Sequence, residues 1–356
     1  MLLRLRRLIN ALARCVLVVL AAELTLRGYS WWTGEQRFYS ADAQLGWRVS
    51  ANLTRTFGGG SGAYLVQTNS KGFRDAEHAE HKPDGGFRVV VLGASTIFGD
   101  GVAQDELCTE RLESMLPATD VINLACVAYS PTQHAVILRA EGWQYEPDVV
   151  LQFLIQSDEN CSFQSWEVTL QRPKCCLVFN GSEISIRPPH FARWQRALHH
   201  SYLAERFVLF GLPLAAAAPG LFTPQPTLTD EEKLAALRLL IMRTWHDCRD
   251  RGIEYRAVYL PAARELDDEG VTQDRFVRDR LLMRMAEQDA LPVVDLSAAL
   301  RQAHADPQRG PLTDSLGLHI NGRGHEVVAG ELAKAMLPVA RRLRSARAPV
   351  QSATPR

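Results

Sequence analysis

The chain has 356 residues, 46% of them hydrophobic, and its 40 Lys and Arg residues balance 40 Asp and Glu residues. This length and composition suffice for one large globular domain with a well-buried core. The even charge balance provides neither a basic surface for nucleic acid nor an acidic solvating arm, so we expect no nucleic-acid partner.

The N-terminus is the one strongly biased segment. Three arginines within residues 4–7 precede an apolar stretch from Leu8 to Leu26. The segment Cys15–Trp32 covers 18 residues, close to the ~20 that a membrane-spanning helix needs. Because arginines favour the cytoplasmic side, we predict a single-pass signal anchor over residues 1–32. It would lie in the inner (cytoplasmic) membrane, with the rest of the chain facing the periplasm or the outside.

Two alternatives remain open for this segment. A cleaved signal peptide would give a secreted protein, although no A-x-A cleavage site follows the apolar run. An amphipathic helix packed on the domain is the other, although clustered arginines beside an apolar run are a poor core-helix pattern. Glu23 and Arg27 stand at i,i+4, so their charges can pair within a helix.

Residues 33–86 form a polar, glycine-rich extension that predicts loops and short strands. Apolar runs then alternate with helical patterns. This indicates βαβ units with right-handed crossovers, and hence an α/β fold: a three-layer α/β/α sandwich around a five-stranded parallel sheet. Its ligand cleft is expected at the carboxyl ends of the strands. The predicted strands are 88–92, 121–127, 149–155, 254–260 and 292–296, and the predicted helices are 104–115, 132–142, 229–251, 273–288 and 323–342.

An insertion over about 160–225 interrupts this rhythm after the third strand. Leu177–Phe179 faces Ile184–Ile186 across an Asn-Gly turn, which predicts a hairpin that shapes the cleft. A surface helix is expected near Tyr202–Leu212. The main domain is predicted over 87–345, followed by a disordered tail over 346–356.

The seven cysteines form no Cys-x-x-Cys pair and keep no zinc-like spacing with histidine, so we expect no structural metal. Free buried thiols are the favoured interpretation. In an exported protein, Cys161 can alternatively bridge to Cys175 or Cys176 at the base of the insertion.

Ser95 stands where the first predicted strand ends. It lies two residues after Gly93, where the chain must turn sharply into a helix, so free backbone N–H groups surround its hydroxyl at the cleft. A serine hydroxyl is a weak nucleophile until a base removes its proton. His319 is the candidate base because it lies in the loop before the last helix, at the same edge of the sheet. Taken singly, Ser95 can also be a helix N-cap and His319 a surface imidazole.

Four stretches of the chain carry a more specific signal. They are an upstream pair within 39–47 and 68–74, then Leu92–Val102, Val121–Gln133 and His319–His325. On these stretches the chain resembles SGNH/GDSL hydrolases of the bacterial exported kind, related in style to proteins that handle acyl groups on exopolysaccharides such as alginate. The resemblance implies the flavodoxin-like SGNH fold and a serine esterase or acyl hydrolase. It also implies an ester or acylated carbohydrate as substrate, with no cofactor.

The resemblance also assigns an oxyanion hole to Ser95, Ala128 and Ser157. Ser95 and Ala128 would contribute backbone N–H groups, although Ala128 stands where the family has a glycine. Ser157 stands where the family has an asparagine, so an amide donor is missing. Loss of one such donor costs about 2.7–4 kcal/mol of transition-state stabilisation unless the Ser157 hydroxyl replaces it.

The acidic residues depart from the family pattern as well. Ala94 replaces the aspartate before the serine, and Leu316 replaces the aspartate three positions before the histidine. Asp314, five positions before it, is the candidate substitute that would orient His319. Asp158 follows the third strand and is a candidate supporting residue. Asn69 and Arg74 either line the mouth of the site or belong to an exposed loop.

Three hypotheses follow. The first is an acyl hydrolase, possessing a Ser95–His319 dyad, that acts on ester-linked acyl groups such as O-acetyl groups of a glycan. The second is a catalytically reduced relative that binds a glycan or serves in cell-envelope assembly. The third is another use of the fold, such as phosphate binding at the turn 93–96. Retention of Ser95 and His319 favours the enzyme, whereas Leu316 and Ser157 favour the reduced relative.

Overall fold

The computed structural model describes residues 2–34, 36–58, 62–167, 169–170, 172–190, 201–203, 228–262, 265–266, 276–314 and 319–347. Its centre is a five-stranded sheet in which every neighbouring pair is parallel. The strand order is β6 (Thr119–Asn123), β5 (Phe87–Leu92), β7 (Val149–Leu154), β12 (Glu254–Tyr259) and β13 (Val293–Asp295). If these five strands are numbered 1 to 5 along the chain, their spatial order across the sheet is 2-1-3-4-5, the flavodoxin-like order. The predicted α/β fold class is therefore confirmed.

The central strands are apolar throughout because helices cover both faces of the sheet. Every residue of β5 and β7 is buried, which explains their uninterrupted hydrophobic runs. The prediction for β6 extended too far, since the strand ends at Asn123. Just beyond, the N–H of Ala125 bonds to the side chain of Asn123 at 3.1 Å and so leaves the ladder.

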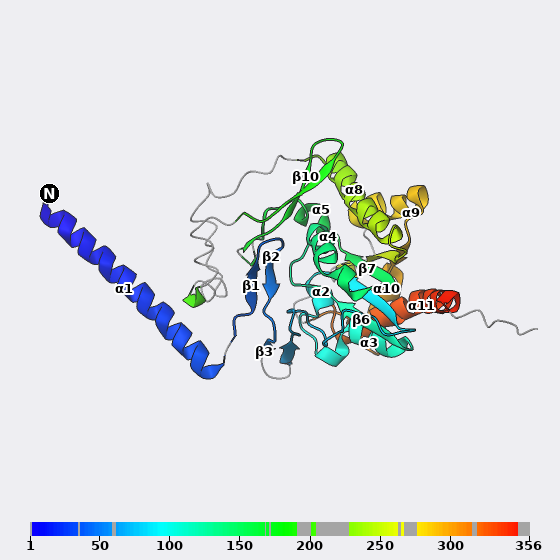
Figure 1. Cartoon of the computed structure of the whole chain (residues 1–356), viewed down its shortest axis with the longest axis horizontal. Helices are drawn as coiled ribbons and strands as arrows, with labels where there is room; N and C mark the ends of the chain where they lie inside the picture. Colours follow the sequence, from blue (N-terminus) through cyan, green and yellow to red (C-terminus); the bar gives the residue numbers. More distant parts are fainter. Residues whose placement is uncertain are drawn as a thin grey trace, which may run out of the picture.

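The helices form two groups around the sheet (Figure 1). One group contains α3 (Cys108–Met115), α10 (Ser297–His304) and α11 (Gly322–Arg347). The other contains α4 (Pro131–Ala140), α8 (Asp230–Arg249) and a π-helix, η7 (Phe276–Met283), that continues as α9 (Arg284–Asp289). Short 3₁₀ turns, η2 (Gln104–Glu106) and η3 (Gly142–Tyr145), adjoin α3 and α4. The three-layer arrangement is thus complete.

Several helix predictions need adjustment at their ends. The expected helix 104–115 is divided at Leu107, whose ψ of 138° is not helical. Helix α10 was not predicted, and α11 runs on to Arg347. The expected start of α8 is confirmed: the N–H of Glu232 bonds to the Thr229 hydroxyl, and the Glu232 carboxylate accepts from the N–H of Thr229. Residues 273–275 and 348–356 lie outside the described residues.

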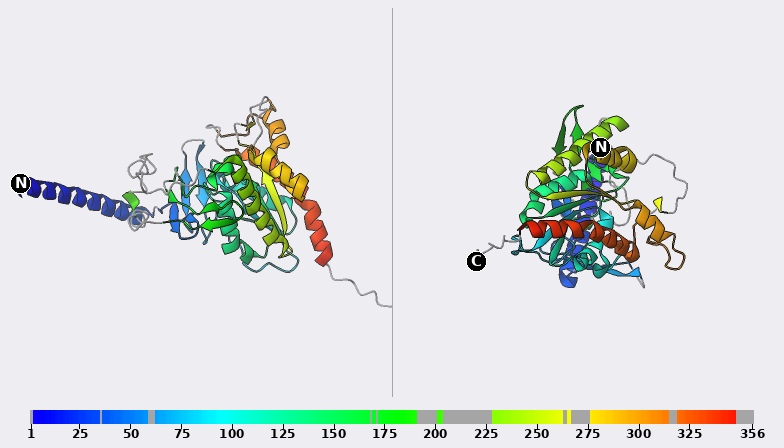
Figure 2. Two further views of the ribbon diagram at one scale, coloured as in Figure 1. Left: turned by 90° about the horizontal axis from the view of Figure 1, so that it is seen from above. Right: turned by 90° about the vertical axis from the view of Figure 1, so that its right-hand side faces the viewer.

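Helix α1 (Leu2–Thr33) projects from the body at the end opposite α11 (Figure 2). It is long and apolar enough to cross a membrane, and its apolar residues are not buried in the body. The expected pair forms, with the Nε of Arg27 2.7 Å from the Glu23 carboxylate. That carboxylate also accepts from the N–H groups of Tyr202 and Leu203, so it ties α1 to the insertion.

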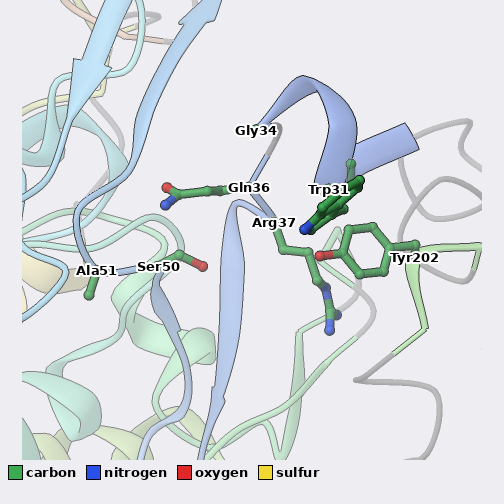
Figure 3. A pocket seen from close by; sticks show the side chains of 8 residues that line it. Trp31, Gly34, Gln36, Arg37, Ser50, Ala51 and Tyr202 are labelled. Carbon is green, nitrogen blue, oxygen red and sulfur yellow. The ribbon is translucent and has the colours of Figure 1, made fainter. Parts of the chain in front are cut away.

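A cavity of about 450 Å³ lies where α1 joins the body (Figure 3). Figure 3 shows the rings of Trp31 and Tyr202 beside the Arg37 side chain, with Ser50 and Ala51 across from them. None of the predicted catalytic residues lines this cavity. It is therefore separate from the site described below.

The extension before β5 is better ordered than loops alone would be. It contains two antiparallel hairpins, β1 (Tyr39–Asp42) with β2 (Gly46–Val49) and β3 (Thr54–Phe57) with β4 (Tyr64–Gln67). Trp47 and Arg74 are both fully buried there. The extension is thus packed against the domain and is part of its core.

The insertion contains the predicted hairpin, as β10 (Cys176–Phe179) paired with β11 (Ile184–Arg187). A second small pair joins β8 (Trp166–Glu167) to β9 (Arg172–Pro173). Of the predicted helix 202–212, only Tyr202 and Leu203 fall within the described residues, and both are helical.

None of the seven cysteines forms a disulfide, so Cys161 makes no bridge to Cys175 or Cys176. Burial raises the pKa of Cys108, Cys126, Cys175 and Cys248 to about 12. Thiols with such pKa values hold almost no thiolate at neutral pH and are unreactive.

Candidate active site

Ser95 begins a short helix, α2 (Ser95–Phe98), at the carboxyl end of β5. The turn needs glycine at position 93, because a Cβ there would lie 2.6 Å from the Cβ of Ile97. The preceding residue, Ala94, gives α2 no side-chain cap. The backbone N–H of Ser95, in the first turn of the helix, finds no acceptor among the described residues.

His319 is delivered by the loop that precedes α11. A bridge between Thr313 and Ile320 closes this loop, and the N–H of Asp314 donates to the carbonyl of His319 at 2.8 Å. The side chain of Asn321 holds the base of the loop, donating to the carbonyls of Pro311 and Thr313 at 3.0 Å each. The two ends of the loop are therefore fixed by hydrogen bonds.

The structure brings together three of the predicted residues. The Nε2 of His319 lies 2.9 Å from the Oγ of Ser95, although the two residues are 224 positions apart. On the other side of the ring, Nδ1 lies 3.5 Å from Oδ2 of Asp314. The His319 and Asp314 side chains are 23% and 22% exposed, so solvent reaches the site. A serine, an imidazole and a carboxylate in this order form the arrangement of a serine hydrolase triad.

Asp314 is thus the carboxylate that lies beside the His319 ring, as the sequence predicted for a substitute of residue 316. Leu316 itself lies outside the described residues. Asp314 reaches the imidazole because the bridge between Thr313 and Ile320 folds the loop back on itself. Its carboxylate also accepts a hydrogen bond from the backbone N–H of His319 at 3.3 Å.

Ala128 lies in the loop after β6, beside the turn that carries Ser95. The N–H of Cys126 donates to the carbonyl of Gly93 at 3.2 Å, so the two loops run side by side. Ala128 has a φ of +61°, a conformation that glycine adopts without cost. Within the described part of the chain, its N–H donates to no acceptor. It is thus available as the predicted oxyanion donor.

Ser157 and Asp158 lie at the start of α5 (Asp158–Cys161). Ser157 is exposed and its hydroxyl bonds to the Cys161 thiol. No interaction joins it to Ser95 or His319 among the residues described, so its oxyanion role stays a prediction. Asp158 is 3% exposed and accepts from the N–H of Ile155, and burial raises its pKa to about 7. Asp158 therefore closes the turn after β7, and its supporting role stays a prediction.

Neither Asn69 nor Arg74 lines the mouth of the site, because both are buried. The guanidinium of Arg74 donates to the carbonyls of Phe98, Gly99 and Val102. Burial lowers its pKa to about 10. Arg74 therefore stabilises, through these hydrogen bonds, the loop that follows α2.

Asp100 is a site residue that the sequence interpretation missed. It lies in that loop, between Gly99 and Gly101, whose φ angles are +90° and +88°. Its carboxylate interacts electrostatically with His319, and burial raises its pKa. The available signal was a carboxylate between two glycines, five residues after the serine.

Among the residues described, no group of three or more His, Cys, Asp and Glu side chains is placed to hold a metal ion. No protein-family model matches the sequence, and no curated protein matches it.

Several solved structures are similar to this chain at low sequence identity. A lipase/acylhydrolase from Enterococcus faecalis has 13% identity and a TM-score of 0.41, with 71% of this chain and 96% of that chain covered. A GDSL-like lipase from Bacteroides thetaiotaomicron has 11% identity and a TM-score of 0.40, with 74% and 93% covered. A two-domain esterase active on acetylated mannans has 11% identity and a TM-score of 0.39, with 72% and 50% covered.

Proposed function

We propose that this chain is a serine acyl hydrolase in which Ser95 is the nucleophile, His319 the general base and Asp314 the residue that orients the imidazole. One observation carries the proposal. The Oγ of Ser95 lies 2.9 Å from the Nε2 of His319, within the distance at which a proton passes between them. The carboxylate of Asp314 on the far side of the ring then favours the tautomer that carries its proton on Nδ1.

The first half-reaction acylates the enzyme. Ser95 Oγ attacks the carbonyl carbon of an ester while its proton passes to Nε2 of His319, and a tetrahedral oxyanion forms. When this intermediate collapses, the bond to the alcohol oxygen breaks and that oxygen takes the proton from His319. The alcohol leaves, and the acyl group remains on Ser95.

The second half-reaction restores the serine. Water attacks the acyl carbon and gives a proton to His319, and the resulting intermediate releases a carboxylic acid as the proton returns to Ser95 Oγ. The exposure of His319 and Asp314, 23% and 22%, gives water a route to the acyl group.

The oxyanion is held in this proposal by the backbone N–H groups of Ser95 and Ala128. Both are free of protein acceptors in the described part of the chain. The two come from loops that run side by side, joined by the bond from Cys126 to Gly93. Donors fixed before the reaction stabilise developing charge without a reorganisation cost.

The substrate and the location follow from the sequence blocks and from α1. Because the blocks resemble those of proteins that handle acyl groups on exopolysaccharides, we propose ester-linked acyl groups, including O-acetyl groups of a glycan, as the substrate class. Because α1 is long and apolar enough to span a membrane, we propose an inner-membrane anchor with the active site facing the periplasm. Cleavage of this helix would instead give a secreted enzyme.

A serine-reactive phosphonate, applied to the full-length detergent-solubilised protein, tests this function. We expect labelling of Ser95, detected by peptide mass spectrometry, together with turnover of p-nitrophenyl acetate. Ser95→Ala should abolish both, and His319→Ala should lower both at least 10³-fold.

A matched serine provides the control. Ser114 is exposed and donates only to the carbonyl of Arg111 within its own helix, so Ser114→Ala should leave labelling and turnover intact. Wild-type protein that is neither labelled nor active above the Ser95→Ala background would reject the hydrolase. That result would instead favour a catalytically reduced relative that binds glycan or serves in cell-envelope assembly.

A further inference from the structure

The loop that carries Ala128 contains a type II β-turn over residues 126–129. The N–H of Tyr129 donates to the carbonyl of Cys126 at 3.2 Å, which closes the turn. Val127 has a negative φ and Ala128 a φ of +61°, the combination that defines type II. The peptide between Val127 and Ala128 is the central unit of this turn, and it contains the N–H predicted to bind the oxyanion.

A type II turn with alanine in its third position is not the conformation that this residue prefers. A positive φ brings the Cβ of alanine close to its own backbone, whereas glycine adopts it freely. Rotation of the central peptide by about 180° gives a type I turn, in which the third residue has a φ near −90°. That rotation would relieve Ala128, but it would also turn its N–H away from the position the oxyanion needs.

The indole of Trp47 opposes this rotation. Its Nε1 donates a hydrogen bond to the carbonyl of Val127 at 3.1 Å, across 80 positions of sequence. In a trans peptide the C=O and the N–H point in opposite directions. A carbonyl of Val127 held against the indole therefore fixes the N–H of Ala128 on the other side of the peptide, away from Trp47.

Trp47 is itself rigidly placed. It is fully buried in β2, and its own carbonyl accepts from the hydroxyl of Tyr129 at 2.8 Å. The neighbouring Gly46 lies so close to β9 that a Cβ there would be 2.1 Å from the carbonyl oxygen of Pro173. The N-terminal extension and the insertion therefore pack together around Trp47, the residue that contacts the turn over residues 126–129.

We propose that Trp47 is a positioning residue, whose indole N–H holds the Val127–Ala128 peptide in the orientation that directs the N–H of Ala128 to the oxyanion. This inference rests on the proposed hydrolase function. It gives the extension before β5 a role in the reaction, although that extension supplies no residue to the triad. It also explains how alanine serves at a position whose backbone suits glycine.

The test uses Trp47→Phe, which keeps an aromatic ring in the core and removes the N–H donor together with part of the indole's volume. We expect kcat for p-nitrophenyl acetate to fall about tenfold, the effect of one lost hydrogen bond, with KM unchanged because the oxyanion exists only after attack. The matched control is Tyr129→Phe. It removes the buried hydrogen bond from the Tyr129 hydroxyl to the backbone carbonyl of Trp47 without touching the indole N–H or the Val127 carbonyl, so kcat should change less than twofold.

A second variant separates peptide orientation from general loosening of the core. Glycine at position 128 has no preference for the rotated turn, so Trp47→Phe should cost less than threefold in kcat when introduced into Ala128→Gly. If the loss stays tenfold in that background, or if Tyr129→Phe loses as much as Trp47→Phe, Trp47 acts only through stability and the proposal fails.

A crystal structure of Trp47→Phe keeps this result distinct from failure of the hydrolase itself. We expect the peptide between Val127 and Ala128 to be rotated or present in two orientations. An unchanged peptide would overturn the inference about Trp47, whether or not the wild-type protein hydrolyses esters. A rotated peptide in a protein that shows no labelling of Ser95 would uphold the positioning role and reject only the proposed function.

Discussion

Two loops bring a carboxylate to His319, and they do so in different ways. Asp314 belongs to the histidine's own loop, lies 3.5 Å from Nδ1 and also accepts from the backbone N–H of His319. Asp100 follows the Ser95 helix and interacts with His319 electrostatically, but its carboxylate accepts no hydrogen bond from any described residue. A carboxylate beside Nδ1 and fixed to the backbone of the same loop can hold the ring in one orientation, whereas a more distant charge cannot. We therefore propose that Asp314 orients the ring and that Asp100, which is half-buried, affects His319 only through its electrostatic interaction.

The loops are also held by different forces. Side-chain hydrogen bonds from Asn321 fix the Asp314 loop. The Asp100 loop depends on two glycines with positive φ and on the buried guanidinium of Arg74. We therefore expect substitutions in the first loop to impair activity and substitutions in the second to impair stability.

Asp314→Asn should have the largest effect. An amide has nearly the same size but presents an NH₂ group as readily as an oxygen, so it no longer favours the tautomer with a proton on Nδ1. We expect kcat to fall about 10²–10⁴-fold, measured with p-nitrophenyl acetate, with little change in unfolding free energy. Asp306→Asn is the control, because that carboxylate lies 3.9 Å from Arg323 and does not contact His319. Wild-type activity in Asp314→Asn would show that another acceptor orients the ring.

Gly99→Ala tests the steric side of the comparison. A Cβ at this position would lie 2.0 Å from Cδ2 of Leu107 and 2.9 Å from Nη1 of Arg74, at a φ of +90°. We expect the unfolding free energy to fall by about 3 kcal/mol, measured by urea denaturation of the detergent-solubilised protein.

Gly101→Ala is the matched control for this prediction. Gly101 has nearly the same φ, +88°, but nothing lies within 4 Å of the point that a Cβ would occupy there. Only backbone strain remains, and we expect a loss of about 1 kcal/mol. Equal losses in the two variants would mean that φ, and not the close packing against Leu107, requires glycine at position 99.

The sequence allowed prediction of those features that local patterns determine. The buried run before Gly93 predicts a strand and a sharp turn, which place Ser95, and the position of His319 before the last helix places it at the same edge of the sheet. The family pattern pointed to position 316, and only the bridge between Thr313 and Ile320 shows how Asp314 reaches the ring.

Features that depend on distant contacts left no local signal. The bond from Trp47 to Val127 joins residues 80 positions apart, and nothing near Trp47 in sequence indicates its partner. The proximity of Asp100 to His319 likewise depends on how two loops from opposite ends of the domain meet. Burial of Arg74 could not be predicted either, because most of its acceptors are backbone carbonyls, which any sequence supplies.

Asp100→Asn should have the smallest effect. We expect it to raise the unfolding free energy, whereas Asp314→Asn should lower activity. Burial raises the pKa of Asp100; His319 and Arg74 lower it, and Asp314 raises it further. The unfolded chain, with a pKa of about 3.9, therefore loses this proton at a lower pH than the folded protein does. Stability of the wild type should fall as pH rises from about 3.9 through the folded pKa, and remain lower above it.

Asparagine removes this titration. At pH 8 we expect Asp100→Asn to unfold with a free energy on the order of 1 kcal/mol higher than the wild type, whereas at pH 3.5 the two should differ little. Activity should change less than threefold, because the amide at position 100 leaves the contact between Asp314 and His319 unchanged. A loss of activity comparable to that of Asp314→Asn would instead make Asp100 the partner of His319, and reverse the assignment of the two loops.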